Sequence, residues 1–205
     1  MFIRTKQFAH ALVLGQERVL QTKNYPIPFN RVIRKTVPIP TGTSQIIFDN
    51  VYDGKLPDLV TLAMVSDRNM GGVYQTRPFH FQNFGAFYLF MQANGEQIPR
   101  FANQPNSAGR DYIRSYFVVL EALAFDIGPN CWDLTPEEWA HGYNIYAFKI
   151  TPGPIGTVRC PARFCAVRLE IKVSNQTPDN VSVLMLSKHC ADIQIDKSKN
   201  IIPIN

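Results

Sequence analysis

The sequence lacks the local motifs of common catalytic and nucleotide-binding sites. A G-x-S-x-G elbow, an H-E-x-x-H helix, a Walker loop and a G-x-G-x-x-G turn are all absent from its 205 residues. Its four cysteines include no C-x-x-C pair, and no two of its four histidines stand at metal-ligand spacing from each other. His189 and Cys190 could form a metal site with Cys160 or Cys165. Cysteines buried in the core are favoured over this alternative. We therefore expect no cofactor, no metal and no enzymatic activity.

Long apolar runs and an export leader are also missing. No apolar segment approaches the ~20 residues that span a bilayer. The opening residues, MFIRTKQF, do not follow the charged-then-apolar plan of a secretory signal. The spacing of the cysteines is irregular, which favours reduced thiols over disulfides. We expect no membrane association and no secretion by a signal peptide.

Positive charge gathers at the N-terminal end. The net charge is +5, and the first 40 residues carry seven basic residues against Glu17 alone. Such a segment could meet phosphate or an acidic protein surface. Aromatic residues are not interleaved there at the spacing typical of nucleic-acid binding, so a solvated rim is favoured and nucleic acid is only a weak candidate partner.

Extended segments dominate beyond the first residues. Val32–Ile39 places Ile33, Val37 and Ile39 on one face, and Cys165–Val173 alternates apolar with charged side chains. About eight such segments, with short helices in the longer connections, predict an all-β antiparallel sandwich or barrel.

The length fits a single β domain with a full core. We expect residues 1–28 to form an N-terminal strand and a helical connector, which ends at Tyr25-Pro26-Ile27-Pro28. Residues 29–205 then form the single domain.

The richest aromatic stretch, Pro78–Pro99, contains a predicted hairpin. Asn94-Gly95 between extended apolar segments favours a two-residue turn, because both residues tolerate positive φ. The strand before it, Ala86–Met91, does not alternate and would be apolar on both faces. One face can pack on a second sheet. The other needs a helix, a long loop or another subunit, which points to assembly.

Two helices are predicted in the connections. Asp111–Phe125 has one apolar stripe, formed by Tyr112, Tyr116, Val119 and Leu123. Farther on, Thr135 and Glu138 form a capping-box signature with proline at the first helical position, and Gly142 can end the short helix. The paired glutamates there are therefore part of the signal that starts the helix.

Several segments in order resemble one family. The matching segments are AHALVLGQERVL (9–20), Leu56-Pro57, Pro78-Phe79-His80-Phe81, Asn94-Gly95 with Pro99, Tyr112-Ile113-Arg114-Ser115-Tyr116, His141-Gly142-Tyr143 with Tyr146-Ala147-Phe148, and 195–200, IDKSKN. Together they resemble the C-terminal jelly roll of the double-jelly-roll, hexon-like major capsid proteins of Polinton (Maverick) elements and adintoviruses. The resemblance covers nearly the whole chain.

The resemblance implies a jelly-roll sandwich that is a structural virion protein. Its relatives carry two adjacent jelly rolls in each subunit and assemble as trimeric capsomers, whereas this chain matches the second jelly roll only. The expected partners are therefore further copies of the chain, a companion jelly-roll domain and other capsid proteins. The expected location is the virion capsid, assembled inside the host cell.

Five aromatic residues are candidate packing or interface anchors: Phe79, Phe81, Tyr88, Tyr112 and Tyr116. The alternative function is a carbohydrate- or receptor-binding β-sandwich that uses exposed Trp132, Trp139 or Tyr74. A third reading, an enzyme on a cupin-type jelly roll, needs a histidine cluster that the sequence does not show.

Overall fold

The computed structural model describes residues 8–52, 55–93, 95–106, 111–123, 133–150, 166–174 and 180–204. The chain divides into two compact units. The terminal unit combines Met1–Arg31 with Cys190–Asn205, and the sandwich unit is Val32–His189. The expected boundary between residues 28 and 29 stays a prediction.

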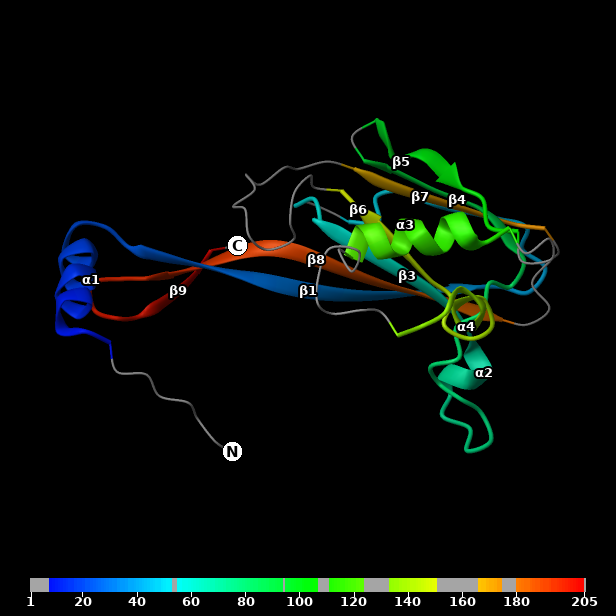
Figure 1. The fold of residues 1–205 in the computed structure, drawn as a ribbon, viewed down its shortest axis with the longest axis horizontal. Helices are drawn as coiled ribbons and strands as arrows, with labels where there is room; N and C mark the ends of the chain where they lie inside the picture. Colours follow the sequence, from blue (N-terminus) through cyan, green and yellow to red (C-terminus); the bar gives the residue numbers. More distant parts are fainter. Residues whose placement is uncertain are drawn as a thin grey trace. The chain divides into compact units, whose positions relative to one another are not determined.

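The sandwich unit is built from two facing β-sheets (Figure 1). One sheet has the order β1-β8-β3-β6, formed by Tyr25–Ile39, Val181–Ile195, Leu59–Ser66 and Ile145–Lys149. The other has the order β2-β7-β4-β5, formed by Gln45–Phe48, Val167–Val173, Ala86–Ala93 and Glu96–Asn103. β3 pairs antiparallel with β6 and β8, and β7 pairs antiparallel with β2 and β4. The fold is the predicted antiparallel jelly-roll sandwich.

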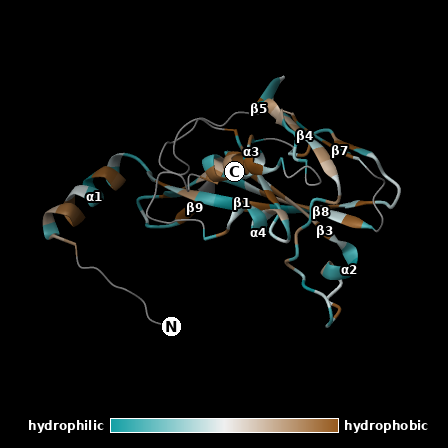
Figure 2. Ribbon diagram, turned by 45° about the vertical axis from the view of Figure 1, so that its right-hand side comes forward, coloured by the Kyte–Doolittle hydropathy of each residue, from teal (hydrophilic) through white to brown (hydrophobic). Residues whose placement is uncertain are grey.

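The core lies between the sheets. Buried side chains come from both of them, as β7 illustrates: Val167, Leu169, Ile171 and Val173 are buried, while the charged residues between them are not. This confirms the alternation read from the sequence, and brown hydrophobic stretches run along the strands and α3 in Figure 2. Trp139, Tyr146 and Phe148 are the largest fully buried side chains among the described residues.

The described residues of the sandwich unit form three helices. They are α2 (Asp67–Met70), α3 (Ile113–Leu123) and α4 (Pro136–Ala140), all in connections between strands. α3 packs beside β6, and α4 follows it in the chain (Figure 1). The two helices predicted around Asp111–Phe125 and Thr135 are therefore present.

The described residues form nine strands, where about eight were expected. β8 is long and runs unbroken from Val181 to Ile195. Ser187 and His189 make the sequence look polar within this strand. Both are buried, and Ser187 Oγ donates a hydrogen bond to the Ile33 carbonyl at 3.2 Å. β5 continues past Pro99 to Asn103.

The terminal unit contains helix α1 (His10–Thr22) and the hairpin between the end of β8 and β9 (Ile201–Ile204). The expected helix is present and runs through Gly15 without a break. The expected first strand lies outside the described residues. None of the thirteen residues of α1 is buried, and its N-cap, Ala9, makes no side-chain capping bond.

Candidate interaction surface

Helix α3 is fixed to three parts of the sandwich unit. It packs along β6, and the Ser115 hydroxyl donates a buried hydrogen bond to the Asn103 side chain at the end of β5. The Tyr116 hydroxyl donates to the Leu134 carbonyl at 2.7 Å, just before α4. These bonds set which side of the helix faces inward.

The inward side of α3 is the predicted apolar stripe. Tyr112 and Tyr116 are each 7% exposed, and their rings lie 6.5 Å and 6.1 Å from the ring of Trp139. Trp139 is 0% exposed, and its indole N–H donates to the Ile145 carbonyl at 3.0 Å. Tyr112 and Tyr116 therefore act as packing residues within this chain.

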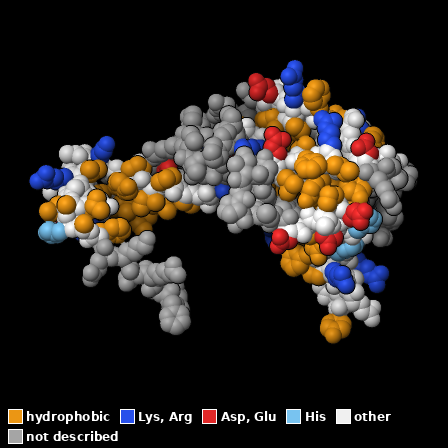
Figure 3. Space-filling view, in the orientation of Figure 1, with side chains coloured by type: hydrophobic (Ala, Val, Ile, Leu, Met, Phe, Trp, Pro, Cys, Tyr) orange, Lys and Arg blue, Asp and Glu red, His pale blue; other side chains and the backbone are white. Residues whose placement is uncertain are grey.

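The outward side of α3 carries exposed apolar side chains beside the charged Arg114 and Glu121. Ile113 and Phe117, one helical turn apart, are 53% and 59% exposed, and Phe101 of β5 is 64% exposed. Figure 3 shows the resulting hydrophobic patch over α3. We call Phe101, Ile113 and Phe117 the α3 face. An amphipathic helix normally turns a polar side to water, so a second apolar stripe indicates a surface that something covers.

Two arginines border the α3 face. The guanidinium carbons of Arg100 and Arg114 lie 5.9 Å and 5.8 Å from the centre of the Phe101 ring, within cation–π range. This aromatic and arginine composition is enriched in the centres of protein interfaces. The sequence analysis missed these residues, although the i, i+4 spacing of Ile113 and Phe117 was a second stripe on the same predicted helix.

A second exposed aromatic group lies on the segment Gly71–Gln82, which we call the aromatic loop. Tyr74 is 102% and Phe79 is 74% exposed. The Phe79 ring meets Phe81 edge-on at 6.5 Å, and Phe81 is partly buried because its backbone bridges to Tyr143. Of the five predicted anchors, Phe79 is thus the one with a freely exposed ring. Its role as an interface anchor stays a prediction.

Tyr88 lies on the outer face of β4. Its ring stacks with Phe90 at 6.2 Å, and the Lys172 ammonium sits 4.8 Å from the ring centre. The inner face of the same strand is buried through Leu89 and Met91. The strand is therefore apolar on both sides, as expected, and neighbouring side chains of its own sheet partly cover the outer one.

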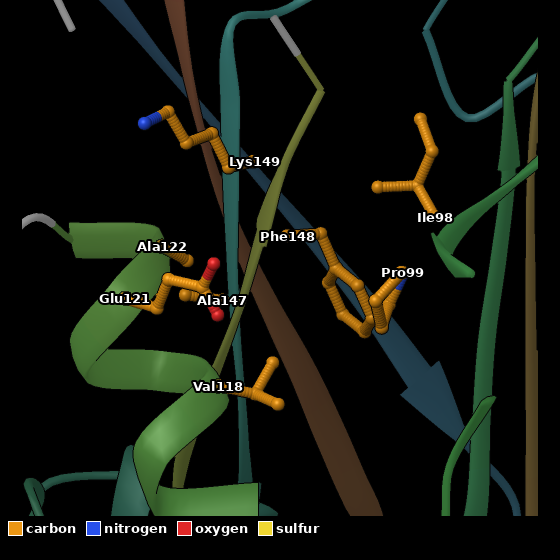
Figure 4. Close-up of a pocket in the computed structure, with 8 residues that line it drawn as sticks. All are labelled: Ile98, Pro99, Val118, Glu121, Ala122, Ala147, Phe148 and Lys149. Carbon is orange, nitrogen blue, oxygen red and sulfur yellow. The ribbon is translucent and has the colours of Figure 1, made fainter. Parts of the chain in front are cut away.

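A cavity of about 200 Å³ lies between α3, β5 and β6 (Figure 4). Val118 and Glu121 of α3 face it from one side, and Pro99 and the Phe148 ring face it from the other, while the ammonium of Lys149 points away. The remaining lining residues are Ile98, Ala122 and Ala147. We call this space the α3 cavity.

The predicted turn and cap residues are structural. Gly95 occupies the β4–β5 turn at φ +84°, and Asn94 lies outside the described residues. Thr135 and Glu138 make the capping box in both directions, and these hydrogen bonds from the Thr135 backbone and hydroxyl lower the pKa of the Glu138 carboxyl. Gly142 follows the C-cap His141, and a Cβ on it would lie 3.0 Å from the His80 ring.

Little in the described residues suggests chemistry. The part of the chain that is described holds no group of three or more His, Cys, Asp or Glu residues able to bind a metal ion. His189 Nε2 lies 3.0 Å from Ser187 Oγ, but both side chains are buried. Burial raises the pKa of the Tyr146 phenol, and its hydroxyl donates to Asn83 at 3.0 Å inside the core.

Across the described segments, no helix combines the length and apolar character needed to cross a bilayer.

Two antiparallel sheets around one core, with helices and loops carrying the exposed aromatic groups, define the chain as a jelly-roll sandwich. A chain in the 3.5 Å cryo-EM structure of the Sputnik virophage has a similar fold, with a TM-score of 0.53 and 13% sequence identity. The match covers 88% of this chain and 39% of the virophage chain. No protein-family model and no curated protein matches the sequence.

The alternative of a carbohydrate- or receptor-binding module depended on exposed aromatic residues. Its prediction for Trp139 is wrong, because that side chain is 0% exposed and fills the core under α3. Trp132 lies outside the described residues. Tyr74 remains exposed.

Proposed function

We propose that this chain is a capsid jelly-roll module whose function is to associate with copies of itself or with a companion jelly roll. The α3 face is the observation that carries the proposal, since a folded sandwich leaves Phe101, Ile113 and Phe117 at its surface. The fold similarity to a chain of a virophage particle supports it. The resemblance to Polinton and adintovirus capsid proteins makes the trimeric capsomer the proposed assembly and the virion the proposed location.

The proposed role requires no chemical step. Permanent subunit interfaces bury on the order of 2,000 Å² or more and are rich in apolar area. At about 25 cal/mol per Å² of apolar surface, part of such an area offsets the loss of rotational and translational freedom on association. The α3 face would form one section of that contact.

Analytical ultracentrifugation of the full chain over a wide concentration range tests the proposal. We expect reversible oligomers, and we expect Phe117→Ser to weaken them by roughly tenfold or more, because an exposed aromatic anchor is lost. Phe87→Ser is the matched control, since Phe87 is also exposed, at 44%, but lies on β4. A chain that stays monomeric at every concentration, also in the presence of a companion jelly roll, would contradict the proposal.

A further inference from the structure

The aromatic loop extends beyond α2, away from both sheets of the sandwich unit (Figure 1). Two successive tight turns shape it. The turn over 73–76 is closed by a backbone hydrogen bond of 2.9 Å and has Tyr74 at a corner. The turn over 77–80 is closed by one of 3.2 Å and has Phe79 at a corner. The backbone therefore holds both rings outward.

We propose that this loop binds the surface of a membrane that contains anionic lipids, with Tyr74 entering the boundary between headgroups and acyl chains. The sequence analysis expected no membrane association because no segment is long enough to span a bilayer. A loop that lies in the interface needs no such segment. The inference goes beyond the proposed self-association and does not depend on it.

Apolar side chains surround the tip of the loop. Met70 at the end of α2 and Val73 are 42% and 43% exposed, and Tyr74 and Phe79 are 102% and 74% exposed. Amphipathic rings such as tyrosine are enriched where a membrane meets water, because one end of the ring is apolar and the other is polar. Binding at such an interface strengthens with the apolar area that leaves water.

The charges next to the tip are basic. Arg68 and Arg77 are exposed, and from Arg68 to Gln82 the chain contains no acidic residue. Asp67, just before this segment, accepts a hydrogen bond from the Ser182 hydroxyl. Figure 3 shows basic side chains near the hydrophobic tip and acidic side chains farther from it. A negatively charged membrane surface therefore attracts this end of the sandwich unit.

A membrane suits this surface better than a folded protein does. A ring that is 102% exposed protrudes alone, so a rigid partner would need a matching pocket to bury it. A fluid interface accepts a protruding side chain without a preformed pocket. The shape and the charge of the loop thus favour the same partner.

Flotation of the full chain with lipid vesicles tests the inference. We expect binding to phosphatidylcholine vesicles that contain about 30% phosphatidylserine, and much weaker binding to vesicles of phosphatidylcholine alone. Tyr74→Ser should weaken the binding roughly tenfold through lost apolar burial, and Arg77→Gln roughly fivefold through lost charge. The matched controls are Phe87→Ser and Arg100→Gln, which remove an exposed ring and an exposed arginine of β4 and β5 and should leave binding unchanged.

Salt separates the two contributions. A higher ionic strength screens the arginines, so the difference between Arg77→Gln and the natural chain should disappear. The difference caused by Tyr74→Ser should persist, because apolar burial does not depend on charge.

Tryptophan fluorescence reports the insertion directly. Tyr74→Trp should shift its emission to shorter wavelength when anionic vesicles are added, since the indole leaves water. Phe87→Trp is the control and should show no shift. Circular dichroism checks that each variant is folded.

The outcomes distinguish this inference from the proposed function. No binding to anionic vesicles at millimolar lipid would overturn the inference. Binding that Tyr74→Ser leaves unchanged would assign it to another surface, such as the basic N-terminal end, and would also overturn it. Loss of self-association in Tyr74→Ser without vesicles, with vesicle binding unchanged, would make the loop a protein contact instead. Oligomers of the natural chain in vesicle-free solution test the proposed function by themselves.

Discussion

The two units of the chain differ in whether their apolar side chains are buried. The sandwich unit buries leucine, isoleucine and aromatic residues between two sheets, with Leu62, Leu89 and Ile171 at 0% exposure. In the terminal unit, α1 has no buried residue, and Leu12 and Leu14 are 60% and 47% exposed. Both units use ordinary helix and strand sequences. Secondary structure alone therefore does not provide stability, because a helix of thirteen residues is marginal in water without tertiary packing.

The comparison separates residues that fold this chain from residues available to other molecules. The sandwich unit has an internal core and needs no partner to form it. The apolar side chains of α1 and of the α3 face remain exposed to water in the folded chain. Under the proposed function, association with another jelly roll would cover these exposed surfaces.

Matched leucine substitutions should show the largest difference between the units. Leu62→Ala should destabilise the chain by roughly 2–5 kcal/mol, because it leaves a cavity at a fully buried site. Leu12→Ala should change the free energy of unfolding by less than about 0.5 kcal/mol in dilute solution. Urea denaturation followed by circular dichroism measures both. A comparable cost for Leu12→Ala, appearing only at high protein concentration, would show that another copy covers α1.

Tyrosine hydroxyls offer the second contrast. Tyr146→Phe removes a buried hydrogen bond to Asn83 and should cost roughly 1–2 kcal/mol at neutral pH. Tyr25→Phe is the control in the terminal unit, where the ring is 44% exposed, and should be nearly neutral.

Alkaline pH should reduce the cost of Tyr146→Phe. Burial raises the pKa of Tyr146, so the unfolded chain loses the phenol proton near pH 10 while the folded chain keeps it. Stability is then complete below about pH 10 and falls as the pH rises above that value. Tyr146→Phe should make this fall shallower, and Tyr52, whose pKa burial also raises, contributes to the part that remains. Unfolding curves with the same pH slope in both chains would show that Tyr146 is hydrated in solution.

The sequence predicted those parts of the sandwich that depend on local pattern. The alternation in β7 and the capping box at Thr135 follow from residues close together in the chain, and the structure contains both. The β4–β5 hairpin follows similarly from the Asn94-Gly95 turn, where Ala93 pairs with Glu96. In each case the residues that determine the local structure lie close together in the chain.

The candidate surface could not be predicted in the same way. α3 has two apolar stripes of equal period, and only the packing of Tyr116 on Trp139 decides which one faces outward. The alternative binding function used Trp139 as an exposed residue, yet the helix places that side chain in the core beside Tyr116. The α3 cavity joins segments near residues 98, 118 and 147, which no local pattern connects.

Helix capping provides a third, smaller contrast. α4 has a complete capping box, and Thr135→Ala should cost about 1 kcal/mol. The N-cap of α1 is Ala9, whose φ of −57° and ψ of 138° suit a capping residue but whose side chain cannot accept a hydrogen bond. Ala9→Ser should therefore increase the helix content of α1 without changing the unfolding midpoint of the sandwich. Far-ultraviolet circular dichroism read before and through the transition separates the two effects, and a higher midpoint for Ala9→Ser would show that the units unfold together.

Glycine substitutions should have the smallest effects, with opposite signs in the two units. Gly95 has a φ of +84° with open space around it, so Gly95→Ala costs about 1 kcal/mol through backbone strain and not through a clash. Gly15 lies inside α1, also in open space, and Gly15→Ala should favour that helix by roughly 0.5–1 kcal/mol because it reduces the freedom of the unfolded chain. Thermal unfolding should register the first change and helix content the second. A loss of helix content in Gly15→Ala would contradict the regular helix through this position, because alanine stabilises a helix interior relative to glycine.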